Sequence, residues 1–178
     1  MSPIIVRFGL KWRSVYWVLA VGLFILAYVI GTVVPLSVEQ ANNIRQGLTE
    51  KNKNLNDLGI FVNNIIPSLE MFIPAAGVAI GAYAAVSTGQ VFNAFSLANP
   101  FLKTISPLSL LITPFAIMEI FAYAIAMSRS AMLAYFLIKR KWRSTWKGYI
   151  IPTIIEIGIV ILILFIGSIV EWQGMAQH

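Results

Sequence analysis

The chain has 178 residues, of which 58% are hydrophobic and only 11% are charged, and its mean hydropathy is +0.81. Soluble domains are about a quarter charged, so this composition excludes an ordinary soluble domain and indicates one compact membrane domain. Cysteine is absent, which excludes disulfides and thiolate metal sites. The net charge of +6 does not indicate nucleic-acid binding, because the basic residues cluster at the ends of apolar segments, where membrane topology places them.

The first apolar segment, residues 15–34, contains twenty residues without a charge. As a helix it would be about 30 Å long, which matches the hydrocarbon core of a bilayer. A cleaved signal peptide is the alternative, since Arg7, Lys11 and Arg13 precede the segment. However, the apolar run is longer than a signal core and lacks a small-residue cleavage site. We therefore predict a retained transmembrane helix.

Residues 36–57 form the longest polar stretch, with three acidic and three basic side chains. We expect a solvated loop outside the cell, in which residues 48–53 can form a short surface helix. The next segment, residues 58–98, has 41 residues and a single charge, Glu70. That length exceeds one ordinary span and fits two short spans or a broken helix. Pro67 and Pro74 are the positions at which a helix would break or kink.

Two further spans are predicted, residues 107–138 and residues 148–170, joined by a basic cytoplasmic loop at 139–147. Both basic clusters, residues 7–13 and 139–147, should face the cytoplasm, which requires an even number of crossings between them. We expect residues 58–98 to cross twice, which gives five crossings, whereas a re-entrant pair of half-helices is the alternative and leaves the count open. The predicted fold is an all-α, multi-pass bundle in the cell membrane, with four to five crossings and a cytoplasmic N-terminus.

Two faces of small residues indicate where helices pack closely. Gly77 and Gly81 form a small-xxx-small pattern, and on an uninterrupted helix they would share a face with Asn63 and Glu70. We expect this close packing within the chain or between copies. The second face, at spacings of three, seven and eleven, consists of Glu119, Ala122, Ala126 and Ser130.

Polar side chains inside the apolar segments are the candidate functional residues, because a polar group in the bilayer is costly and normally faces protein or water. They are Asn63, Asn64, Glu70, Asn93, Glu119, Arg129 and Glu156. We expect Arg129 to meet Glu70 or Glu156 on another helix, or to extend to a lipid headgroup. Interhelical hydrogen bonding and a transport or ligand-binding role are both open for these groups.

Residues for conventional enzyme chemistry are missing from the apolar segments. The only histidine is His178, and the only aspartate is Asp57, in the polar stretch. No nucleophile elbow, phosphate loop, zinc motif or dinucleotide fingerprint occurs. We therefore expect no enzyme activity, no metal and no cofactor.

Several short motifs, in order along the chain, resemble the stage II sporulation protein M family. That family shows F-x-N-N, spaced glycines, an N-G pair, P-H-G-x-x-E and a closing apolar helix that ends in Glu. The matching residues, within about 15–172, are 61–64, Gly77, Gly81, 93–94, 114–119 and 169–171. The sequence departs from the family at Phe115, which replaces its His, and at Ala94 and Ala116, which replace glycines.

The resemblance implies a divergent member whose Pro114 begins a helix with Glu119 facing inward. Glu119 and Asn63 would then be the most sensitive polar positions. The sporulation member belongs to a membrane machine that remodels the cell wall, a role that the missing His does not support here. We expect a scaffold or assembly subunit of a membrane complex, with a small channel, transporter or permease subunit as the alternative. The expected partners are the lipid bilayer and other membrane proteins or further copies of the chain, and not nucleic acid.

Overall fold

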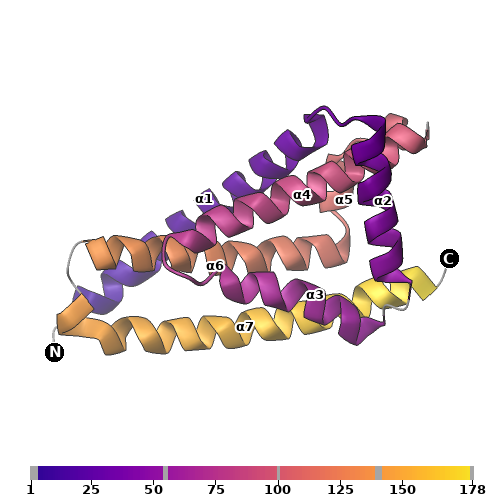
Figure 1. Cartoon of the computed structure of the whole chain (residues 1–178). Coiled ribbons are helices and arrows are strands. Elements are labelled where there is room, and N and C mark those ends of the chain that lie inside the picture. The colour runs from indigo at the N-terminus through magenta and orange to yellow at the C-terminus, as the bar shows by residue number, and fades with distance from the viewer. Residues whose placement is uncertain (1–3, 54–55, 100, 139–141, 177–178) are drawn as a thin grey trace.

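The computed structural model describes residues 4–53, 56–99, 101–138 and 142–176. The described chain consists of helices and short connections, which confirms the predicted all-α class (Figure 1). In chain order the helices are α1 (Ile4–Val33), α2 (Val38–Asn52), α3 (Asp57–Glu70), α4 (Ala76–Ala98), η1 (Leu102–Thr104), α5 (Leu108–Leu111), α6 (Pro114–Ile138) and α7 (Trp142–Ala176).

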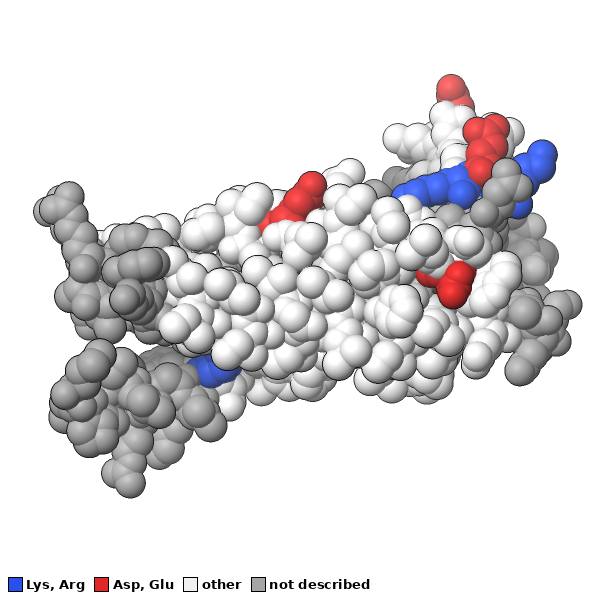
Figure 2. Space-filling model, turned by 90° about the horizontal axis from the view of Figure 1, so that it is seen from below, with Lys and Arg blue, Asp and Glu red and all other residues white. Residues whose placement is uncertain are grey.

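Three helices in the described chain are long and apolar enough to cross a membrane. The candidate spans are Trp12–Val33 in α1, Pro114–Ile138 in α6 and Tyr149–Gly174 in α7. In Figure 1, α6 and α7 run in opposite directions along the bundle, and α1 crosses them obliquely. The face in Figure 2 is almost uncharged in its middle, and most of its described charged side chains gather at one end. The expected four to five crossings are not confirmed, since only these three helices meet the criteria of length and composition.

The long helices extend beyond the predicted apolar segments. α1 begins at Ile4, so the first basic cluster lies on the same helix as the first span. α7 begins at Trp142 instead of 148 and passes through Pro152 without ending. α6 begins at Pro114, as expected from the resemblance, because proline suits the first turn of a helix. The predicted loop 139–147 is therefore helical at residues 142–147, and its other residues lie outside the described part of the chain.

The predicted polar loop is mostly helical. α2 has 15 residues and is therefore longer than the short helix expected at 48–53. Its start is fixed by a capping box, in which the Ser37 hydroxyl accepts from the Gln40 backbone N–H and the Gln40 side chain accepts from the Ser37 N–H. Figure 1 shows α2 lying across the end of the bundle, roughly perpendicular to the long helices.

The segment 58–98 is a broken helix, as one of the two alternatives predicted. The break falls at residues 71–75, between α3 and α4, and Ala75 has a φ of 66°. Pro74 disfavours a helical conformation at Ile73, which explains the position of the break. Pro67, by contrast, lies within α3. The expectation of one uninterrupted helix face is therefore wrong, because the chain reverses after Glu70.

α3 and α4 form a hairpin whose turn lies inside the bundle. α3 has 14 residues, about 21 Å, which is shorter than the hydrocarbon core of about 30 Å. In Figure 1 both open ends of the hairpin point toward the end of the bundle that carries α2. Its turn stops short of the opposite end, where α6 leads into α7.

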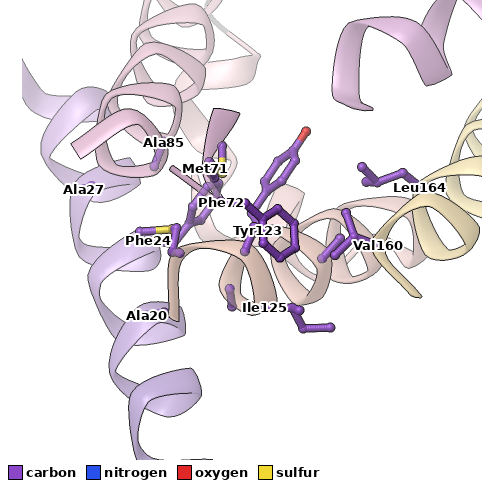
Figure 3. Close-up of a cluster of buried hydrophobic side chains, with 14 of the residues drawn as sticks. Ala20, Phe24, Ala27, Met71, Phe72, Ala85, Tyr123, Ile125, Val160 and Leu164 are labelled. Carbon is purple, nitrogen blue, oxygen red and sulfur yellow. The ribbon is translucent and has the colours of Figure 1, made fainter. Parts of the chain in front are cut away.

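The turn of this hairpin is packed in the hydrophobic core. Met71 and Phe72 are 0% and 7% exposed and belong to the same cluster as Phe24 of α1 and Tyr123 of α6 (Figure 3). A hydrogen bond of 2.6 Å from the Ser130 hydroxyl to the Ile73 carbonyl secures the turn against α6. The Ile73 carbonyl also accepts from the Gly77 backbone N–H of α4 at 2.8 Å, so hydrogen bonds to both α4 and α6 hold the turn in addition to its buried side chains.

Candidate functional site

An ionic cluster of Arg13, Arg129 and Glu156 joins the three candidate spans. Arg13 Nε on α1 donates to Glu156 Oε1 on α7 at 2.7 Å. Arg129 on α6 donates from Nε to Glu156 Oε2, also at 2.7 Å, and from Nη2 to Oε1. The structure therefore confirms Glu156 as one of the expected partners of Arg129. Glu70, the other expected carboxylate, is exposed at the end of α3.

The remaining donors of Arg13 also bind α6. Nη2 donates to the Ile125 carbonyl at 3.1 Å, and Nη1 donates to the Ser128 hydroxyl. The side chains of Arg13, Arg129 and Glu156 are only 19%, 6% and 14% exposed. An unpaired charge at this depth would be costly, so the shared carboxylate is what permits two guanidinium groups between the spans.

Arg13 was not among the candidate residues, because the sequence assigns it to the basic cluster that precedes the first span. It is the last basic residue before the apolar run, which is the position of an interfacial anchor. Its partner Glu156 is 143 residues away. The only signal in the sequence was therefore the charge of Glu156 itself, because a buried carboxylate needs more than one hydrogen bond to a neutral group.

A second polar contact joins the hairpin to α6. Asn64 Nδ2 of α3 donates to Glu119 Oε1 of α6. Glu119 thus faces inward on a helix that begins at Pro114, as the resemblance implied. Asn64 makes this contact instead of Asn63, although both asparagines are half-buried, and the expected sensitivity of Asn63 stays a prediction. Two helical positions differ by about 100°, so adjacent asparagines cannot both face the same carboxylate.

Asn93 and the two predicted glycines also serve contacts within the chain. Asn93 Nδ2 of α4 donates to the Val34 carbonyl at the end of α1, at 2.7 Å. Gly77 lies against the backbone of Met71, and Gly81 lies against the side chain of Met127. Of the two expectations for Gly77 and Gly81, the structure therefore shows close packing inside one chain. Ala122, Ala126 and Ser130 of the second predicted face are all 0% exposed, but every residue from 122 to 130 is buried, so burial does not distinguish that face.

Two other glycines, which the sequence analysis did not single out, bring α1 and α4 into backbone contact. Gly31 of α1 lies against the Val86 backbone, and Gly89 of α4 lies against the Tyr28 carbonyl and Gly31. They are separated by 58 positions, so spacing within one helix could not reveal them.

These arrangements are chemically suited to holding helices together. Each carboxylate accepts from a nitrogen donor on another helix, and no nucleophile lies beside a general base in either contact. In the described part of the chain, no group of three or more His, Cys, Asp or Glu side chains is placed to hold a metal ion.

The fold and its buried ion pairs define a class: an all-helical protein with three helices suited to crossing a membrane. Comparisons with protein-family models, with curated proteins and with solved structures find no match for this chain. The resemblance to the stage II sporulation protein M family therefore stays a prediction.

Proposed function

We propose that the protein is a non-catalytic scaffold or assembly subunit of a complex in the cell membrane. The observation that carries this proposal is that the polar side chains between the spans bind one another. Glu156 is held by Arg13 and Arg129, and Glu119 is held by Asn64. Groups committed to such interhelical contacts stabilise a fixed arrangement of helices, which is what a scaffold needs.

The proposed topology has three crossings and a re-entrant hairpin. With the N-terminus in the cytoplasm, α1 leads out, α6 leads in and α7 leads out, while α3 and α4 enter from the outer side and return to it. Only α1 and α6 then cross between the two basic clusters, so both clusters stay cytoplasmic without a double crossing of 58–98. Backbone at membrane depth is tolerated where it is buried in protein. Met71 and Phe72 of the turn are buried, whereas Ile73 is 50% exposed and Glu70 is also exposed.

Cysteine labelling tests this topology, since the chain has no cysteine of its own. An impermeant thiol reagent should label Asn43→Cys on α2 in intact cells, and Ser144→Cys only after the cells are opened. Ile73→Cys, in the turn, should react in neither condition, because the re-entrant turn reaches neither aqueous phase. Labelling of Ile73→Cys in opened cells alone would establish five crossings and refute the hairpin.

A transporter or channel subunit is the alternative, and one observation favours it. The hairpin turn is bound to Ser130, the residue next to Arg129 of the ionic cluster. Broken helices that end near charged groups at membrane depth are a feature of transporters. In that case the cluster or Glu119 would exchange partners during transport instead of holding one arrangement.

Liposomes that contain the purified protein distinguish the two functions. The scaffold proposal predicts that ion and solute flux stays at the level of empty liposomes, and that other membrane proteins co-purify with the chain in mild detergent. Flux that disappears in Glu119→Gln, with Glu39→Gln on the exposed part of α2 as the matched control, would refute the scaffold and establish transport. Co-purifying proteins would also identify the complex, or a homo-oligomer if only the chain itself is recovered.

A further inference from the structure

A groove lined by charged, polar and apolar side chains lies between α2 and the last turns of α4, away from the ionic cluster. It consists of two adjoining hollows of about 480 and 590 Å³ that share Thr49, Glu50 and Phe95. Arg45 lines one hollow and Lys53 lines the other. Most of the lining surface is apolar, and charged side chains contribute to both hollows, at the end of the bundle where charged groups gather (Figure 2).

Arg45 is incompletely satisfied in this groove. Its Nη2 donates to Asn42 Oδ1, three residues earlier on the same helix. Its Nε is buried and has no hydrogen-bond partner among the described residues. A buried donor without an acceptor is destabilising, so the guanidinium would gain by turning toward an acceptor in the groove.

The charges of the groove favour an anion as that acceptor. Arg45 and Lys53 outnumber Glu50, which leaves an excess of one positive charge among the lining residues. Guanidinium groups bind phosphate and carboxylate oxygens through parallel N–H donors. Figure 1 shows α2 lying across the end of the bundle, so in the topology proposed above the groove would lie at the depth of lipid headgroups.

We propose that this groove binds the phosphate group of an anionic phospholipid headgroup, with Arg45 as the principal ligand and Lys53 as a second cation. The Thr49 hydroxyl donates to the Arg45 carbonyl and so supplies no donor to the phosphate, while Phe95 contacts the glycerol end of the lipid. The proposal rests on the membrane placement of α2 proposed above. Bound lipid would fix α2 against α4 and so tie the surface helix to the re-entrant hairpin.

The test uses the full chain in a neutral detergent with phosphatidylglycerol as the probe. The fraction of lipid-bound protein is measured by native mass spectrometry, and the shift of the unfolding midpoint is measured in parallel. Arg45→Gln should weaken binding by about tenfold or more, because a charge-assisted hydrogen bond is lost. Lys51→Gln, which removes the same charge from an exposed position of α2 outside the groove, should bind like the wild type.

Two further measurements identify the source of the phosphate and distinguish a loss of binding from a loss of folding. Diacylglycerol, which has the same tails without the phosphate, should not bind, and inorganic phosphate that binds equally well would identify a free phosphate as the ligand. Arg45→Lys keeps the charge and should still bind several-fold more weakly, since it lacks the planar donor fork. Equal losses in Arg45→Gln and Lys51→Gln, or equal binding of diacylglycerol, would refute the site. If cysteine labelling confirms α2 outside while phosphatidylglycerol fails to bind, only the groove is refuted.

Discussion

Replacing Glu156 by glutamine should lower the free energy of unfolding by about 3–5 kcal/mol, because it leaves two buried guanidinium groups without a counter-charge. Arg13 and Arg129 both donate to this one carboxylate, and their side chains are 19% and 6% exposed. Glutamine preserves the shape of Glu156 and one acceptor oxygen, so the loss measures the charge. The measurement is thermal or chemical unfolding of the purified protein in one detergent.

The matched control is Glu39→Gln, the same chemical change at an exposed position of α2, which should alter stability by less than about 0.5 kcal/mol. The triple change of Arg13, Arg129 and Glu156 to leucine should recover most of the lost stability. Well-packed apolar groups often replace a buried ionic cluster at little cost in stability, whereas removal of one partner leaves the other charges buried without a counter-charge. A Glu156→Gln protein as stable as Glu39→Gln would show that water or headgroups reach the cluster.

Gly31→Ala should destabilise the protein by about 1–3 kcal/mol, because the added methyl group collides with backbone. A Cβ atom at Gly31 would lie 2.9 Å from the carbonyl carbon of Val86 and closer still to its oxygen. A flexible side chain could turn away from such a contact, but the α4 backbone can yield only by moving the helix. Since α4 belongs to the α3–α4 hairpin, the loss should appear as separation of the hairpin from α1.

Gly22→Ala provides the control on the same helix, where a Cβ would meet nothing within 4 Å. Alanine is the better helix former by about 1 kcal/mol, so this change should be neutral or slightly stabilising. The two variants are compared by unfolding in one detergent, and by protease sensitivity of residues 71–75. Equal stability of Gly31→Ala and Gly22→Ala would mean that α1 and α4 do not pack at the distance observed.

The all-α class and the three long apolar helices follow from composition and from runs of uncharged residues. The composition of each run reflects whether that segment faces lipid or water, and composition is a local property of the chain. The break in 58–98 was also predictable as one of two alternatives, because Pro74 acts on its own neighbours. The start of α6 at Pro114 and the inward position of Glu119 came from short motifs of the same local kind.

The sequence did not determine which helices meet. Glu156 could be assigned to Arg129 only as one of two partners, and Arg13 was assigned to the basic cluster before the first span because its partner is 143 residues away. Asn63 was preferred to Asn64, although a difference of 100° on α3 decides which of them reaches Glu119. Gly31 and Gly89 were missed because each is unremarkable until the other helix lies against it.

The sequence by itself therefore determined the kind of surface that each helix needs: apolar along α1, α6 and α7, and polar along α2. Only the tertiary structure decided that α3 and α4 turn back inside the bundle, and that one carboxylate serves two arginines. The physical reason is that burial in lipid depends on the composition of a segment, whereas hydrogen bonds and backbone contacts depend on the rotation and depth of each helix relative to its neighbours. Those relative positions are set by packing among residues far apart in the chain.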